Sequence, residues 1–181
     1  HLHMEKIRQG AIAVLTHKEN VVFLPLPEED IAPLNNGGKE KKERARGDEE
    51  WTVLQQGMLG FVSGGVKTDE DLGLMQKPDQ ETIVFETIRR EADEEFGLPV
   101  NLDKSEIVRD GIIEQVRYGE AMTFLLWVVT RVVIEENNLL KLKERVDVVE
   151  VPVDQLKDFL ASEKKSIRPA AQQAVLSAYK L

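Results

Sequence analysis

Three glutamates near the middle of the chain have a spacing that would cluster their carboxylates as possible ligands for divalent metals. Glu91, Glu94 and Glu95 stand at positions i, i+3 and i+4, which are neighbours on an α-helix of 3.6 residues per turn. Like charges at this spacing repel by roughly 0.2–0.5 kcal/mol per pair, so a nearby positive group is expected. Carboxylate oxygens are the ligands that Mg²⁺ and Mn²⁺ prefer. The cluster therefore predicts a divalent-metal site.

The helix that carries these acids should have one apolar stripe, formed by Phe85, Ile88, Ala92 and Phe96. On a helical wheel, Glu95 projects about 50° from the centre of that stripe, Glu91 about 90° and Glu94 about 150°. Glu91 and Glu95 should thus lie at the edge of the buried face, where an unpaired carboxylate is costly. Glu94 should face solvent.

The alternative is an ordinary solvated helix face, held by pairs at i, i+4 such as Glu86 with Arg90. The surrounding residues favour a functional site. Ser63-Gly64-Gly65 lies upstream, and glycine lets the backbone approach a ligand or metal closely. Gly97 ends the helix. The acidic helix thus begins after a glycine loop and ends at a glycine, and these flanking residues favour a functional site over a plain surface helix.

This order resembles the Nudix box, G-x5-E-x7-R-E-U-x-E-E-x-G-U, in which U is aliphatic. Its second half matches at every fixed position, with Ala92 as a small U. The matching residues are Arg90, Glu91, Ala92, Glu94, Glu95, Gly97 and Leu98. The box covers under a fifth of the chain, and the flanking strand pattern extends the resemblance to most of it.

The first half of the box departs from the family. Gly65 matches the leading glycine, but sixteen residues separate it from Thr82, where the family has five. We interpret the difference as an insertion within about Val66 to Asp79. Thr82 stands in the place of the first Glu and Glu81 lies one position early, so the residue that fills this mainly structural role stays open. Ser63 replaces the usual proline.

The resemblance implies a fold, a metal site and a reaction. The fold is the α/β (α+β) class, an α/β/α sandwich with a mixed β-sheet. The Gly65 carbonyl and the carboxylates of Glu91, Glu94 and Glu95 would bind Mg²⁺ or Mn²⁺, and Arg90 would hold the glutamates by charge-assisted hydrogen bonds. The catalytic residues would be Glu94, Glu95, Arg90 and a further acid from the later strands, for which Glu120 is the first choice.

The implied reaction is hydrolysis of a pyrophosphate bond in a nucleoside diphosphate linked to another moiety. Nucleoside triphosphates, dinucleoside polyphosphates, nucleotide sugars, ADP-ribose and capped RNA ends all fit the box, so the substrate stays open. One rival is a Nudix-like binding or regulatory module without turnover, which the interrupted first half of the box favours. A second is a scaffold whose acidic helix is only a surface. Binding of a divalent metal distinguishes the scaffold from the other two.

The composition limits the class of protein and the kinds of chemistry that the chain can carry out. The chain has 181 residues, 41% of them hydrophobic, which is ordinary for one globular domain. We expect that domain to span 5–181, with 1–4 as an expression-tag remnant. No cysteine is present, so thiolate chemistry is excluded, and a reducing cytoplasm is in keeping with this. The net charge of −9 argues against general nucleic-acid binding, and no apolar run is long enough for a membrane span. The oligomeric state stays open, a homodimer included.

The hydrophobic pattern predicts strands alternating irregularly with helices, without a repeat. Strands are expected at 9–15, 21–26, 51–56, 58–62, 107–117, 122–134 and 146–153, and helices at 82–96, 154–161 and 169–179. Asp154 is the expected N-cap of the second helix. The polar stretch 27–50 predicts a mobile loop. Its lysines and arginines could instead grip phosphates: Lys39, Lys41, Lys42, Arg44 and Arg46.

Other candidates for chemistry are weaker. His17 falls in a predicted turn and is expected to be solvated. Neither a G-x-S-x-G motif nor a P-loop is present, which excludes those hydrolase and NTPase classes. Four aromatic residues could stack on a nucleobase but are better explained as core: Trp51, Phe61, Tyr118 and Trp127.

Overall fold

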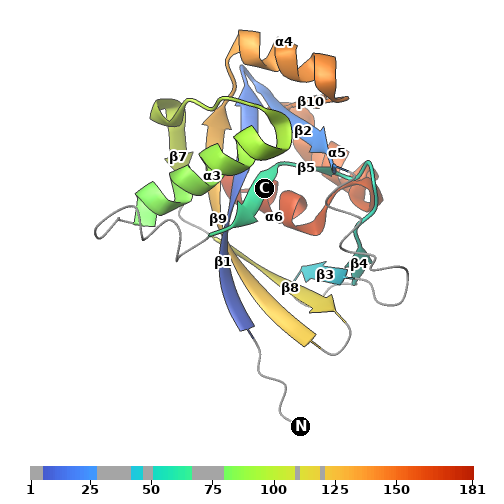
Figure 1. The fold of residues 1–181 in the computed structure, drawn as a ribbon. Coiled ribbons are helices and arrows are strands. Elements are labelled where there is room, and N and C mark those ends of the chain that lie inside the picture. The colour runs from blue at the N-terminus through green and yellow to red at the C-terminus, as the bar shows by residue number, and fades with distance from the viewer. Residues whose placement is uncertain (1–5, 28–41, 47–50, 67–79, 109–110, 119–120) are drawn as a thin grey trace.

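The computed structural model describes residues 6–27, 42–46, 51–66, 80–108, 111–118 and 121–181, and Figure 1 shows their arrangement. Their strands form one ten-stranded sheet, of which seven follow the order β10-β2-β1-β9-β8-β3-β4. The strands on this path are β1 (Lys6–His17), β2 (Asn20–Pro25), β3 (Lys42–Arg46), β4 (Thr52–Val53), β8 (Ile112–Tyr118), β9 (Ala121–Val133) and β10 (Val149–Pro152). The other three are β5 (Leu59–Gly60) beside β2, β6 (Val62–Gly65) beside β1, and β7 (Ser105–Ile107) beside β9.

The middle of the sheet is the parallel pair β1 and β9, in register from Lys6 opposite Thr123 to Thr16 opposite Val133. The neighbouring pairs are antiparallel, so the sheet is mixed, as the sequence predicted. Parallel strands need a long connection, and here it includes both the glycine loop and the acidic helix.

Helices cover both faces of the sheet. On β9, the side chain of Arg131 reaches α6 (Pro169–Tyr179) and donates from Nη1 to the Ala178 carbonyl at 3.3 Å. Side chains alternate between the two faces, so Trp127 shares the α6 face, whereas Thr130 and Leu126 point the other way. The opposite face is covered by α3 (Gln80–Phe96), which Figure 1 shows in front of the sheet with α6 behind. The α/β/α layering is therefore confirmed.

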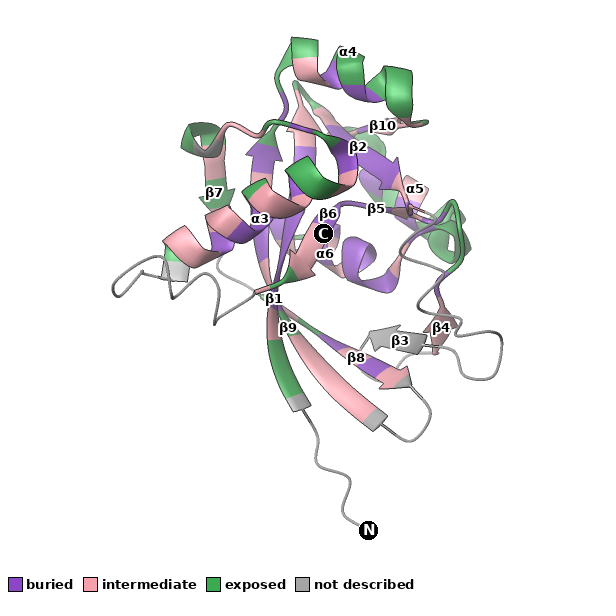
Figure 2. Ribbon diagram, in the orientation of Figure 1, coloured by how far each residue is buried: buried purple, intermediate pink, exposed green. Residues whose placement is uncertain are grey.

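The core lies between these layers, and Figure 2 shows it as the purple centre of the sheet and the inner sides of the helices. Val14, Val22 and Phe23 are fully buried there, as are Ile88 of α3 and Val175 of α6. Within the described residues, no helix is long and apolar enough to cross a membrane.

Several boundaries differ from the sequence predictions. The region predicted as a loop at 27–50 contains β3 at Lys42–Arg46, which pairs with both β4 and β8. The strand predicted at 107–117 is two strands, β7 and β8, and both pair with β9. The strands predicted at 51–56, 58–62 and 146–153 are shorter or shifted, with β6 starting at Val62 and including both glycines.

For the C-terminal helices, the sequence prediction missed one helix and assigned the wrong N-cap to another. The helix α4 (Glu136–Arg145) was not predicted, because its five charged residues leave only Leu139 and Leu142 as buried anchors. Residue Asp154 lies inside the short 3-10 turn Val153–Gln155 and does not cap α5 (Leu156–Ser162), whose N-cap is Gln155. The terminal helix 169–179 is confirmed, with Pro169 in its first turn.

His17 is not the solvated turn residue that the sequence predicted. It is the last residue of β1, and its side chain is only 12% exposed. The ring Nδ1 lies 2.9 Å from the Ile134 carbonyl oxygen and Nε2 lies 2.7 Å from Glu136. The turn itself is shorter than expected, and Lys18 adopts φ 53° within it. The histidine thus fastens β1 to the start of α4.

Candidate functional site

The acidic helix exists. It starts at Gln80, two residues before the predicted start, and ends at Phe96 as predicted. One buried row of α3 contains Val84, Ile88, Ala92 and Phe96, which pack against the sheet. The predicted stripe had Phe85 in place of Val84, but Phe85 is only half-buried. At the C-terminus Gly97 takes φ 58° and donates its N–H to the Asp93 carbonyl at 2.9 Å, a helix end that favours glycine. Arg145 of α4 donates from Nη1 to the Phe96 carbonyl at 2.6 Å and adds positive charge at this helix end.

The three glutamates take the positions that the helical wheel predicted. Glu91 and Glu95 are partly buried at the edge of the apolar face, and Glu94 is exposed. On the outer side of the helix, Arg89 donates to Glu86 at 2.9 Å, and this carboxylate raises the pKa of Arg89 through the hydrogen bond and its charge. The arginine that faces inward is Arg90.

Glu91 lies directly against the glycine loop. A Cβ atom added to Gly64 would lie 2.3 Å from Glu91 Cδ and 2.5 Å from Oε1, so only glycine leaves room for this side chain. Gly64 pairs with Ala11 of β1, and both point to the α3 face of the sheet. At Gly65, by contrast, an added Cβ would meet no described atom within 4 Å. The sequence predicted that the glycines would allow a ligand or metal to approach the backbone closely. In the structure the group that lies close to the backbone is the Glu91 side chain, at Gly64.

Arg90 joins the loop to the helix. Its Nη2 donates to the Gly65 carbonyl at 3.2 Å and lies 3.8 Å from Glu91 Oε1. The side chains of Arg90 and Glu91 are only 16% and 15% exposed, so these contacts are partly shielded from water. Three parts of the candidate site therefore lie in contact: the end of β6, Arg90 and Glu91.

The donor set suits a hard divalent cation by its chemistry, since it consists of carboxylates and a backbone carbonyl. A carbonyl oxygen has two lone pairs, so the Arg90 contact leaves Gly65 one acceptor position. The described residues do not include a ready-made group of three converging acids.

The remaining candidates from the sequence lie either in the first turn of α3 or, for the most part, outside the described residues. Glu81 and Thr82 lie in the first turn of α3, where Glu81 is exposed and Thr82 half-buried, and the first Glu position stays open between them. Glu120, the chosen further acid, lies outside the described residues, as do Lys39, Lys41 and most of the insertion at 66–79. Of the other basic residues at 42–46, only the backbone is described.

The aromatic candidates are mainly structural. Phe61 is buried and stacks on Phe23 with ring centroids 4.9 Å apart. Trp127 is buried on the α6 face and donates from Nε1 to Glu114 at 3.2 Å. Trp51 is half-buried beneath the guanidinium of Arg117, 4.2 Å from the ring centroid. The side chain of Tyr118 lies outside the described part.

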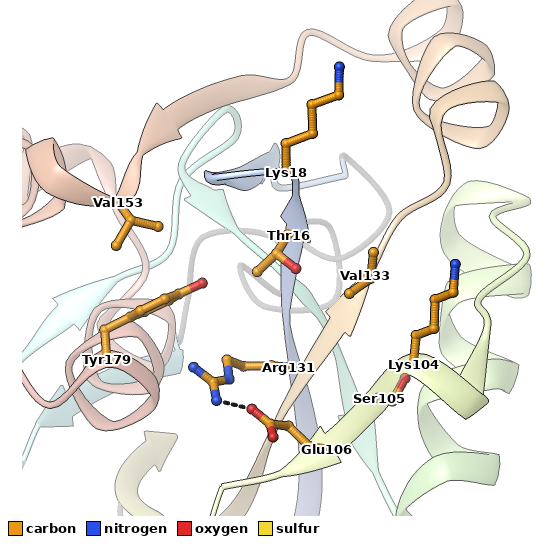
Figure 3. Close-up of a pocket in the computed structure, with 9 residues that line it drawn as sticks. All are labelled: Thr16, Lys18, Lys104, Ser105, Glu106, Arg131, Val133, Val153 and Tyr179. Carbon is orange, nitrogen blue, oxygen red and sulfur yellow. Dashed lines mark hydrogen bonds and ion pairs between the residues drawn. The ribbon is translucent and has the colours of Figure 1, made fainter.

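A pocket of about 390 Å³ lies on the α6 face, across the sheet from the acidic helix, and Figure 3 shows it. Arg131 forms an ion pair with Glu106 there and stands over the ring of Tyr179, 5.5 Å from its centroid. Burial raises the pKa of Tyr179. Lys104 is 3.3 Å from Glu135. Since these two cations already have acidic partners, the pocket is a weaker candidate than the acidic helix.

Comparisons with known proteins give structural matches. No protein-family model matches the chain, and no curated protein matches it. A crystal structure of an ADP compounds hydrolase aligns at TM-score 0.51 and 12% identity, over 96% of this chain and 71% of that one. The solution structure of the E. coli ORF135 protein aligns at TM-score 0.46 and 14% identity, over 97% and 91%.

A NUDIX hydrolase from Nitrosomonas europaea aligns at TM-score 0.45 and 10% identity, over 97% of this chain and 90% of that one. Sequence identities this low support a conclusion about the fold alone. Of the three alignments, only the one with the ADP compounds hydrolase, at TM-score 0.51, supports that conclusion. This chain has the mixed-sheet α/β/α fold that is also seen in a solved ADP compounds hydrolase.

Proposed function

We propose that this protein is a Nudix-type hydrolase that cleaves a pyrophosphate bond in a nucleoside diphosphate linked to another moiety, with Mg²⁺ or Mn²⁺. One observation carries the proposal. The helix that contains the second half of the box lies against the glycine loop, so that Gly64, Gly65, Arg90 and Glu91 meet although Arg90 is 25 positions after Gly65 in the chain. An ordinary solvated acidic helix would have no reason to place its arginine on that carbonyl.

In this proposal Glu91, Glu94, Glu95 and the Gly65 carbonyl hold the cation. When bound, the cation would neutralise phosphate charge and lower the pKa of a coordinated water. Glu91 is fixed by the space at Gly64, whereas Glu94 is exposed and can change rotamer to reach a ligand. Glu94 and Glu95 would also serve as carboxylates that take a proton from the attacking water, with Glu120 as a further acid.

Support from the comparisons is limited to the fold. The matched protein is named as an ADP compounds hydrolase, and at 12% identity the match supports the shared fold alone. The chain carries net charge −9, so a polyphosphate would be repelled without a cation, which agrees with a metal-dependent reaction.

The direct test is a panel of purified diphosphate compounds incubated with the protein and Mg²⁺ or Mn²⁺. The panel contains ADP-ribose, a nucleotide sugar, a dinucleoside polyphosphate, a nucleoside triphosphate and a capped RNA, and released phosphate or nucleotide is measured. We expect at least one compound to be cleaved, and chelation with EDTA to abolish the cleavage. If the protein binds Mn²⁺ and a panel member but releases no product, the binding-module alternative holds instead.

Arg90 provides a prediction about the site itself. Arg90→Ala should weaken Mn²⁺ binding and lower turnover by about 10- to 100-fold, the usual cost of losing a residue that orients metal ligands. Arg90→Lys should recover only part, because one ammonium group cannot reproduce the planar guanidinium that contacts both Gly65 and Glu91. Calorimetric Mn²⁺ titration and initial rates measure the two effects.

The matched control is Arg89→Ala, which removes a neighbouring arginine that forms an ion pair with Glu86 on the outer side of the same helix. That variant should keep metal affinity and rate. Equal behaviour of the two alanine variants would show that Arg90 does not position Glu91.

A further inference from the structure

The helix α4 is docked on the sheet by few contacts, and Figure 1 shows it lying across the top of the sheet. It has ten residues, of which only Leu139 and Leu142 are buried. A helix of this length is marginally stable by itself. Its N-cap residue, Glu135, makes no side-chain cap hydrogen bond. The contact between His17 of β1 and Glu136 in the first turn of α4 therefore helps to decide how firmly the helix start is held.

Both nitrogens of the His17 ring face hydrogen-bond acceptors. Nδ1 lies 2.9 Å from the Ile134 carbonyl oxygen, and this carbonyl is fixed in place because the Ile134 N–H donates to the Thr16 carbonyl at 2.7 Å. A carbonyl only accepts, so Nδ1 has to carry a proton. Nε2 lies 2.7 Å from a carboxylate oxygen of Glu136, which also accepts. A neutral ring has a single N–H, so the geometry fits the imidazolium, which has two.

The charges around the ring agree with this assignment. The His17 side chain is only 12% exposed, and a charged ring at such a place needs an opposite charge in contact with it. Glu136 supplies that charge, since its side chain is 57% exposed and lies in the first turn of a helix, where a carboxylate is favoured. The other charged groups at this end of the sheet are exposed or paired with one another: Lys18 and Glu19 in the turn after β1, Lys104 with Glu135, and Lys143 with Glu150 of β10.

We propose that His17 and Glu136 form a proton-dependent latch that holds the start of α4 on the sheet. With both nitrogens protonated, the ring donates to Ile134 and to Glu136 at the same time. When the ring loses one proton to solvent, the remaining N–H stays on the Ile134 carbonyl and Nε2 presents a lone pair to the carboxylate. Two acceptors then face each other, so Glu136 turns away into water.

The sign of the pH effect follows from the chemistry of the latch. The latch needs the proton, so its contribution to stability is complete at acid pH and is lost as the pH rises through the range in which a histidine ring ordinarily changes charge, about pH 5 to 8. At its other end α4 donates from Arg145 to the carbonyl of Phe96, the last residue of the acidic helix. The latch therefore acts on an element that contacts the candidate site, but it does not depend on the proposed hydrolase activity.

The first test is nitrogen NMR of the His17 ring in the whole protein. His17 is the one histidine between residues 4 and 181, so its signals are assigned by comparison with His17→Gln. Both ring nitrogens should carry a proton at about pH 5.5, and at about pH 8.5 the proton on Nε2 should be lost while Nδ1 keeps its own. A neutral ring that carries its proton on Nε2 would overturn the proposal.

The second test is a double-mutant cycle of His17→Gln and Glu136→Gln, measured as equilibrium unfolding in urea at the same two pH values. The coupling between the two positions should change the unfolding constant at least about threefold at the lower pH and less than about twofold at the higher pH. The interaction of Glu136 with the helix dipole is present with and without His17, so it cancels in the cycle.

The matched control is Glu144→Gln, which removes the same charge from an exposed position in the last turn of α4. It should show no coupling with His17 at either pH. Should His17→Gln misfold by circular dichroism, the unfolding of Glu136→Gln against that of Glu144→Gln repeats the test, and only the former should lose more stability at the lower pH. Coupling that is absent at the lower pH, or equal at both, contradicts a latch that depends on the proton.

Discussion

Replacing Glu94 or Glu95 by Gln is expected to lower turnover by at least about 100-fold, close to 3 kcal/mol of transition-state stabilisation. Gln keeps the size of the side chain but removes the negative charge that would hold a cation. The fold should be retained, because Glu94 is exposed and because removing one of three clustered like charges relieves repulsion. Initial rates with the cleaved panel compound and a thermal unfolding curve measure the two outcomes.

The control for this prediction is Asp93→Asn. Asp93 precedes Glu94 on the same helix and is exposed, but it is not part of the i, i+3, i+4 set. It should retain nearly the full rate. Near-normal turnover in both glutamine variants would contradict the assignment of the acidic helix as the metal site.

The second large effect is expected at Gly64. In Gly64→Ala the new Cβ would lie 2.3 Å from Glu91 Cδ, so the flexible Glu91 side chain has to leave its place. The backbone does not require glycine there through a positive φ, so the fold should persist. Displacement of a positioned group by about 1 Å can cost about 100-fold in rate, and we expect a loss of that order together with weaker Mn²⁺ binding.

The neighbouring glycine serves as the control. Gly65→Ala adds the same methyl group where no described atom lies within 4 Å, and its backbone also lacks a positive φ. Because the variant also keeps the Gly65 carbonyl that would hold the cation, metal affinity and rate should remain close to normal. If the two alanine variants lose activity equally, the contact between Gly64 and Glu91 is not what positions the glutamate.

The acidic helix was the most predictable part of the chain, because its signals are local. The period of the apolar residues placed Glu91 and Glu95 at the edge of the buried face and Glu94 in solvent, and the glycine at 97 located the end of the helix. The terminal helix had an equally local signal in Pro169, which lies in its first turn. Periodicity and end signals depend only on neighbouring residues, so one sequence suffices for both.

The errors arose where long-range contacts decide the structure. The charged segment Lys42–Arg46 is a strand because β8 and β4 lie on either side of it, which its composition does not reveal. The helix α4 needs only Leu139 and Leu142 as anchors. The ring of His17 is engaged by residues 117 or more positions away. The position of Glu91 over Gly64 could not be predicted either, because it depends on the pairing of β6 with β1.

The parallel pairing of β1 with β9 also determines the order in which the molecule can be assembled. Ile12 and Thr130, which are joined by a hydrogen bond at 3.2 Å, lie 118 residues apart in the chain. Closing so long a loop is entropically costly and slows folding, whereas β1 and β2 can pair at once as a hairpin. During synthesis, β1 is made long before its central partner. The glycine loop and the acidic helix can come together early, but the central parallel pair of the sheet beneath them forms only when β9 has been made.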